Sequence, residues 1–167
     1  GRFGRIANAF DVSTAMPLAI YLATEPSIAT RLAEAFCALE SYILRRDICG
    51  LTTKNYKRFF ASLIPRLRTC DGDKVDELIV YLSNRLTDLD RWPDDAEWER
   101  NWVMREQYRS ARQPRLRYIL ETIEREKHTA KTEDFQIRST LTIEHIMPQK
   151  WQTNWALPGM ELVAEAD

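Results

Sequence analysis

Cysteine is scarce in this sequence. Its three copies, Cys37, Cys49 and Cys70, stand far apart and are odd in number. No two of them have the C-x-x-C spacing of a structural zinc site, so no zinc is predicted. We expect reduced thiols in a cytoplasmic protein, with Cys37 packed on a helix.

Long apolar runs are absent as well. No segment approaches the roughly 20 apolar residues that a transmembrane helix needs, so no membrane contact is predicted. The segment 1–5 lacks the apolar stretch of a secretory signal and begins without Met, which leads us to expect a piece excised from a longer protein. A chain of 167 residues can bury one core, or one core with a small appendage.

An overall charge of one sign is also missing, since the net charge is −1. The balance is +5 over residues 1–70, −6 over 71–104, +3 over 105–138 and −3 over 139–167. This distribution excludes a uniformly basic nucleic-acid-binding protein and leaves room only for local basic patches.

Apolar residues at three-four spacing predict helices over most of residues 1–135. The expected helical stretches are 14–23, 28–43, 53–67, 75–86, 94–102 and 114–123. Ser27, Thr53 and Asp94 are expected caps, while Pro65 is expected to kink or end its helix. In the last stretch Leu116, Ile119, Leu120 and Ile123 are expected to be buried, and Trp98 and Trp102 are expected to pack against the core.

The pattern changes after Lys131. Apolar residues and His145 then occupy odd positions, with polar residues at most even ones, which predicts a strand from about 139 to 146 that ends at Pro148. The predicted fold class is therefore mainly α, with a multi-helix domain over residues 1–135 and a different, incomplete unit over residues 136–167.

Glu144 and His145 form the sharpest chemical feature, because the chain holds only two histidines. A neutral imidazole can take a proton from water near neutral pH, and a carboxylate is the hard oxygen ligand that Mg²⁺ or Mn²⁺ prefers. The pair therefore suits metal-assisted phosphodiester hydrolysis. The alternative is a histidine at a strand end that bonds to a neighbour, beside a solvated glutamate.

The densest basic cluster contains Arg109, Arg112, Arg115 and Arg117. One interpretation is contact with nucleic-acid phosphates, which positions a nucleic acid without reading its sequence. The other is a solvated helix start with i,i+4 pairing, such as Arg117 with Glu121. For Arg45 and Arg46 a structural role at a helix end is favoured over DNA contact.

The segment Glu144-His145-Ile146-Met147-Pro148 resembles the start of the HNH, or His-Me finger, nuclease motif. Residues 141–151 with Trp155 resemble more narrowly the C-terminal domain of GmrSD-type restriction endonucleases. Two helical stretches are similar to the same family: Arg45-Arg46-Asp47-Ile48-Cys49-Gly50-Leu51 with Thr53-Lys54-Asn55-Tyr56, and Arg115-Leu116-Arg117-Tyr118-Ile119-Leu120.

The resemblance implies a metal-dependent DNA endonuclease of bacterial phage defence that hydrolyses foreign, modified DNA. In this family His145 would be the general base, Glu144 would help to hold Mg²⁺ or Mn²⁺, and residues 136–167 would contain the first strand of a ββα-metal finger. The family's asparagine, in a Gly-Asn-Leu-Thr type segment, is not found here, and Asn154 follows His145 too closely for that role. The fragment alone is thus expected to be inactive.

The resemblance also implies a partner. The family contains an NTP-hydrolysing domain, and no G-x-x-x-x-G-K-[ST] loop occurs in this chain, so another domain or subunit would supply that activity. The alternative function is a non-catalytic helical module that binds DNA or a protein and couples an NTPase to its target.

Overall fold

A computed structural model describes residues 2–110, 113–129 and 142 of the chain. The chain divides into two units, Gly1–Lys131 and Thr132–Asp167. The described residues of the first unit form helices and connections and contain no strand, which confirms the prediction of a mainly α fold. The predicted strand at 139–146 lies outside the described residues except for Thr142, and the predicted boundary after residue 135 stays a prediction.

Most of the first unit is helical. Its elements in chain order are α1 (Arg2–Ala9), η1 (Ser13–Ala15), α2 (Met16–Thr24), η2 (Pro26–Arg31), α3 (Leu32–Ile48), α4 (Tyr56–Thr69), α5 (Lys74–Ser83), α6 (Asp95–Met104), α7 (Gln107–Ser110) and α8 (Gln113–Lys127), where η marks short 3₁₀ helices. None of the helices in this described part is long and apolar enough to cross a membrane.

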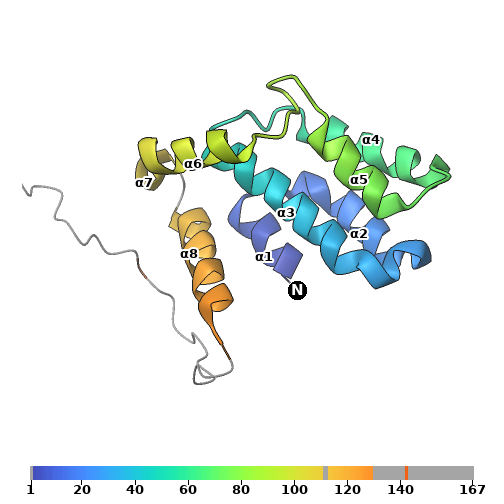
Figure 1. Cartoon of the computed structure of the whole chain (residues 1–167), viewed down its shortest axis with the longest axis horizontal. Coiled ribbons are helices and arrows are strands. Elements are labelled where there is room, and N and C mark those ends of the chain that lie inside the picture. Colours follow the sequence, from blue (N-terminus) through green and yellow to red (C-terminus); the bar gives the residue numbers. More distant parts are fainter. Residues whose placement is uncertain (1, 111–112, 130–141, 143–167) are drawn as a thin grey trace, which may run out of the picture. The chain divides into compact units, whose positions relative to one another are not determined.

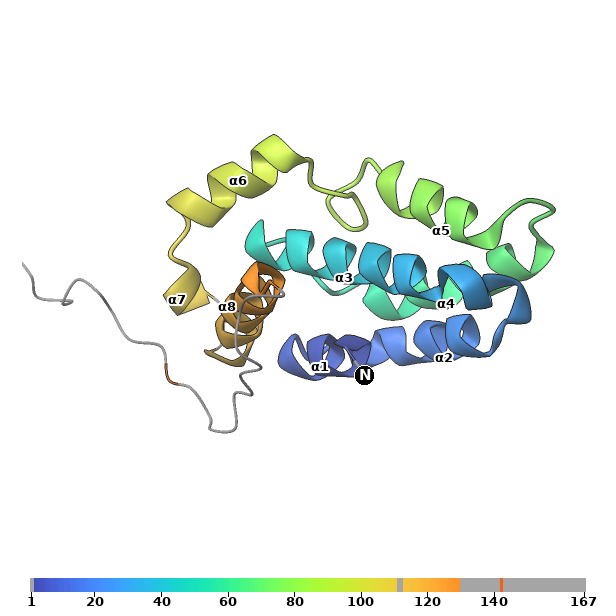
Figure 2. The same ribbon diagram turned by 60° about the horizontal axis from the view of Figure 1, so that its bottom comes forward.

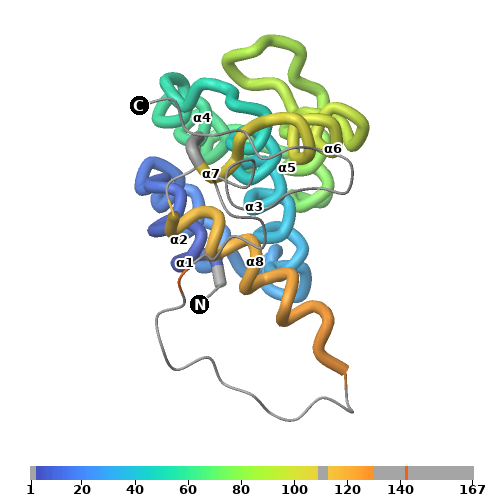
Figure 3. The backbone as a smooth tube through the Cα atoms, turned by 90° about the vertical axis from the view of Figure 1, so that its left-hand side faces the viewer, coloured from blue at the N-terminus to red at the C-terminus, as the bar shows by residue number. Residues whose placement is uncertain are grey.

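The long helix α3 occupies the middle of this unit (Figure 1). Helices α1 and α2 follow one side of α3 and α5 follows another (Figure 2), in agreement with direct contacts of α3 with all three. Helix α4 contacts α2 and α5, and α6 contacts α3. Helix α8 returns to contact α1, so late and early parts of the chain lie together (Figure 3).

The core is built from the apolar faces of these helices. Tyr42 of α3 is fully buried and stacks on Phe59 of α4 with ring centroids 5.0 Å apart. Trp98 and Trp102 of α6 stack at 5.9 Å and pack against this core, as predicted. The fully buried apolar side chains include Ile6, Leu18, Leu22, Ile28, Leu39, Phe60, Leu63, Leu67, Leu78 and Leu82.

Helix starts are only partly as predicted. The Asp94 side chain accepts a hydrogen bond from Glu97 N at 2.7 Å and caps α6, which confirms that prediction. Ser27 does not cap α3; instead Glu25 accepts from Ser27 N at the start of η2. Thr53 provides only a backbone acceptor for Tyr56 N, since α4 begins after Asn55 without a side-chain cap.

Two helix ends also differ from the prediction. Helix α4 does not end at Pro65 but continues to Thr69. Pro65 and Ala61 are both exposed, so the Ala61 carbonyl that loses its usual donor can bind water. Helix α5 ends at Ser83, which leaves Leu86 in the following connection with 91% of its surface exposed.

The prediction for α8 is wrong at two of its four apolar positions. Leu116 and Ile119 are buried, whereas Leu120 and Ile123 are 44% and 43% exposed. The apolar stripe of α8 is wider than the surface that α1 covers, so its outer edge stays open in the described unit. Cys37 is also exposed rather than packed, and all three cysteines are free thiols.

Candidate nucleic-acid interface and nuclease motif

The predicted catalytic pair, Glu144 and His145, lies outside the described residues. Its assignment as metal ligand and general base therefore stays a prediction. Within the part of the chain that the structure describes, no group of three or more His, Cys, Asp or Glu side chains is placed to hold a metal ion. The predicted site residues whose side chains the structure describes are therefore Arg115 and Arg117.

The structure describes the side chains of two of the four arginines of the predicted basic cluster, Arg115 and Arg117. Arg109 belongs to α7 and Arg112 follows that helix, but neither side chain is among the described ones. Arg117 lies on α8 with 37% of its side chain exposed, 3.7 Å from a carboxylate oxygen of Glu121. Arg125 approaches the same glutamate at 3.3 Å. The i,i+4 pairing considered as an alternative is thus present.

Arg115 is turned into the protein. It forms an ion pair with Asp47 of α3, and its side chain is only 20% exposed. Its guanidinium also donates to the Phe10 carbonyl at 3.4 Å and lies 5.8 Å from the Phe10 ring centroid. Arg115 therefore joins α8 to α3 and to the segment after α1, while its role as a DNA contact stays a prediction.

Asp47 shows the electrostatic cost of this arrangement. Burial raises the pKa of its carboxyl group above the ordinary value, against the opposing effects of Arg115 and Arg105. The ion pair nevertheless has close geometry, so the two cations compensate part of the desolvation and do not remove it. Asp47 is a structural carboxylate that sequence reasoning did not single out.

Arg46 is fully buried. Its guanidinium donates to the carbonyls of Thr52 at 2.7 Å and Arg91 at 2.8 Å, and to those of Asp88 and Leu89 at 3.1 Å each. The aromatic rings of Tyr42 and Tyr56 flank it, with centroids 5.4 and 5.6 Å from Cζ. Arg46 therefore fixes the connection between α5 and α6 and the loop before α4, which confirms a structural role.

Arg45 contacts the same connection from outside. It donates to the Pro93 carbonyl at 3.1 Å, forms an ion pair with Asp95 at 2.5 Å, and lies 5.5 Å from the Trp92 ring. Arg45 and Arg46 thus bind the connection that leads into α6, and Asp47 binds α8. Their position in the sequence indicated a helix end, but it did not indicate these distant partners.

The end of α3 is closed by Gly50 and Arg105. Gly50 has a φ of +66°, and its N–H donates to Asp47 O while Leu51 N donates to Arg46 O, the hydrogen-bond pattern of a Schellman motif. Arg105, directly after α6, adds a hydrogen bond to Ile48 O at 2.5 Å. No local sequence signal marked Arg105 as a partner of this helix end.

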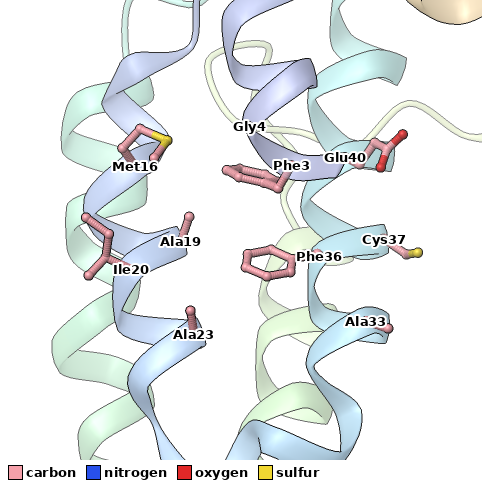
Figure 4. A pocket seen from close by; sticks show the side chains of 10 residues that line it. All are labelled: Phe3, Gly4, Met16, Ala19, Ile20, Ala23, Ala33, Phe36, Cys37 and Glu40. Atoms are coloured by element: carbon pink, nitrogen blue, oxygen red, sulfur yellow. The ribbon is translucent and has the colours of Figure 1, made fainter. Parts of the chain in front are cut away.

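An apolar groove of about 510 Å³ lies between α1, α2 and α3. Figure 4 shows Met16 and Ile20 on its α2 side and Phe36 on its α3 side, with Phe3 of α1 stacked on Phe36 at 5.1 Å. Glu40 is the one carboxylate among the lining residues. The groove is lined mainly by apolar side chains. It lacks the adjacent carboxylate and imidazole that are predicted to carry out phosphodiester hydrolysis.

The described unit is thus helical, and residues at the end of α3 bind the connection between α5 and α6, Arg105 and α8. Residues 92–165 match the family described as GmrSD restriction endonucleases, C-terminal domain. This match confirms the resemblance that the motifs suggested. The matched segment contains Trp92, α6, α7 and α8 together with Glu144 and His145, whereas the stretch 45–56 precedes it. Comparison with curated proteins and with solved structures gives no match.

Proposed function

We propose that this chain is part of a metal-dependent DNA endonuclease that hydrolyses phosphodiester bonds of foreign, modified DNA in bacterial phage defence. The observation that carries the proposal is the match of residues 92–165 to the C-terminal domain of GmrSD restriction endonucleases. That segment contains a carboxylate next to an imidazole, Glu144-His145, in a chain with only one other histidine.

His145 is the general base in this proposal. Its neutral imidazole accepts the proton of the attacking water, and an unperturbed histidine pKa of about 6.5 leaves it mostly neutral at physiological pH. Water that has lost a proton attacks the phosphorus, and the leaving oxygen departs with the electrons of the cleaved P–O bond. General base catalysis of this kind contributes about 10² to 10⁴-fold to a rate.

Glu144 is the proposed oxygen ligand for the metal. Its chemistry fits Mg²⁺ or Mn²⁺, which prefer hard oxygen donors, and it does not fit a thiolate-dependent zinc site. When bound, such an ion stabilises the negative charge that develops on the phosphate. One carboxylate provides at most two donor atoms, so further ligands are required to complete the coordination.

The upstream helices contact the first part of the matched region. Asp47, near the end of α3, pairs with Arg115 at the beginning of α8, which belongs to the matched region, and Arg46 binds carbonyls of the connection directly before that region. We infer that the helices before residue 92 hold the first part of the matched region, through α8, in place. An NTP-hydrolysing domain or subunit is the proposed partner, and the cytoplasm is the proposed location.

Plasmid nicking by the intact protein tests the proposal. We expect conversion of supercoiled plasmid to the nicked form with Mg²⁺ or Mn²⁺, prevention by EDTA, and loss of activity in His145→Ala. His128→Ala is the matched control, since it removes the other histidine, which lies 3.5 Å from Glu124 after α8. If neither unmodified nor phage-modified DNA is cut, the nuclease assignment is wrong and the non-catalytic module that couples an NTPase to its target takes its place.

A further inference from the structure

The exposed side of the α4 start carries a dense group of positive charge. Residues 51–70 contain five Lys or Arg and no Asp or Glu. Three of these cations are exposed within five consecutive positions: Lys54 lies just before α4, and Lys57 and Arg58 lie in its first turn. The opposite face of the helix is buried through Phe59, Phe60, Leu63 and Leu67, so the charged face is turned to solvent.

These three cations are not neutralised within the part of the protein that the structure describes. Arg66, further along α4, forms an ion pair with Glu77, and Arg31 is paired with Glu34, Asp73 and Asp76. Lys54, Lys57 and Arg58 form no ion pair with any described residue. Most arginines of the scaffold are therefore used internally, whereas this group keeps its charge available.

The position on the helix increases the effect of this charge. The first turn of α4 contains no acidic residue, and no side chain caps its start. A helix N-terminus already carries partial positive charge, so cations there are electrostatically unfavourable in the free protein. A polyanion placed against this surface would relieve that repulsion, because it compensates the side chains and the helix end together.

The backbone beneath the group is held in place. Thr52 O accepts from the buried Arg46 at 2.7 Å, Lys54 N donates to Thr52 Oγ1 at 3.3 Å, and Tyr56 N donates to Thr53 O at 3.0 Å. Tyr56 itself is 3% exposed. The long side chains can thus adjust to a ligand while their attachment points stay fixed, which limits the entropy lost on binding.

We propose that Lys54, Lys57 and Arg58 form a surface that binds the phosphate backbone of DNA. The proposal rests on the proposed endonuclease function, which supplies a DNA duplex as the polyanion. Lysine and arginine contacts to phosphates position a duplex without reading its sequence. The surface precedes, in the sequence, the segment that matches the endonuclease family, so it would be a phosphate contact separate from the proposed catalytic pair.

The test is the salt dependence of DNA binding by the intact protein, measured by fluorescence anisotropy with a labelled duplex of mixed sequence. The variant Lys54→Gln/Lys57→Gln/Arg58→Gln is compared with Arg5→Gln/Arg100→Gln/Lys127→Gln, which removes the same charge from exposed positions on three other helices. Three lost phosphate contacts lower the slope of log K against log salt by about 2.7, with a loss of affinity on the order of ten-fold.

A smaller slope and weaker binding in the α4 variant alone support the proposal. Equal effects of the two triple variants overturn it. The proposal is also overturned if the α4 variant loses binding to poly-glutamate but binds the duplex unchanged, a result that indicates an acidic protein partner. Far-ultraviolet circular dichroism verifies that both variants are folded, and Lys57→Gln alone provides a milder second variant with a slope change of about 0.9. If the intact protein nicks plasmid with metal but the α4 variant binds the duplex as the control variant does, the surface proposal is wrong and the endonuclease proposal stands.

Discussion

Asp47 near the end of α3 forms an ion pair with Arg115 of α8, 68 positions later in the chain. The carboxylate and the guanidinium are 15% and 20% exposed, so both charges are largely removed from water. Because Arg115 belongs to the segment that matches the endonuclease family and Asp47 precedes it, this pair joins the upstream helices to the matched segment.

The raised pKa of Asp47 predicts a specific pH dependence of stability. In the interval between the ordinary value of 3.8 and the raised value, the folded state binds more protons than the unfolded state. The contribution of Asp47 to stability is therefore greatest below this interval and is lost as the pH rises through it. Asp47→Asn removes this dependence and keeps the shape of the side chain.

Urea unfolding of both proteins at a series of pH values measures the effect. The free energy of unfolding of the original protein, relative to that of Asp47→Asn, is expected to fall with rising pH across this interval. Other titrating groups contribute equally to both proteins and cancel. Parallel curves would show that the carboxyl group has the same pKa in the folded and unfolded states.

Arg46 is expected to be the most costly arginine to remove. Arg46→Ala leaves its carbonyl acceptors without their donor and empties a fully buried site, with a predicted loss of about 3 kcal/mol or more in the free energy of unfolding. Arg46→Lys keeps the charge but cannot reach four acceptors, so an intermediate loss is expected. Arg45→Ala is the control, at about 0.5 to 1 kcal/mol, because its partner Asp95 is 82% exposed.

Denaturant unfolding measures this order of stabilities. If Arg46→Ala costs no more than Arg45→Ala, the carbonyl contacts of Arg46 contribute little, and the connection between α5 and α6 is held by other groups. If Arg46→Lys is as stable as the original protein, a point charge is sufficient at this site.

Gly50 and Arg105 are predicted to be energetically coupled. Gly50→Ala places a residue at a φ of +66°, at a cost of about 1 kcal/mol, and the added Cβ would lie 2.5 Å from Cζ of Arg105. The arginine must then move and lose its bond to Ile48 O, at a further cost of about 1 kcal/mol. Gly72→Ala is the control, because nothing lies within 4 Å of its added Cβ.

A double-mutant cycle separates the two contributions. In the Arg105→Ala background, Gly50→Ala is expected to cost only the conformational part, about 1 kcal/mol. Strict additivity of the two single changes would contradict the steric contact between the added methyl group and the guanidinium.

Local sequence signals predicted the features that depend on neighbouring residues. The cap at Asp94 requires only an acceptor three positions before Glu97 N. The family was also predictable, because its motif residues are contiguous. Pro65 does not end α4, since its exposed helix face is open to water at the position of the missing donor, and the alternative of a kink stays a prediction.

The partners of the buried charges could not be predicted in this way. Arg46 has acceptors 42 to 45 positions later, and an arginine pair at a helix end is equally compatible with solvent exposure. Leu120 and Ile123 have the spacing of core residues, but burial depends on what lies opposite, and α1 covers only part of the α8 stripe. The spacing of apolar residues is therefore compatible with a buried or an exposed side chain, and the neighbouring helix determines which of the two occurs.

The two proposed catalytic residues are expected to fail in different ways in the intact protein. Glu144→Gln weakens metal binding, so a higher Mg²⁺ or Mn²⁺ concentration is expected to restore much of the nicking rate. His145→Ala removes the proton acceptor, so the rate is expected to stay about 10² to 10⁴-fold lower at every metal concentration. Plasmid nicking across a metal titration, with DNA binding measured in parallel, distinguishes these cases. Recovery of His145→Ala by added metal would instead identify His145 as a metal ligand, and equal, metal-independent loss in both variants would remove Glu144 from the ligand set.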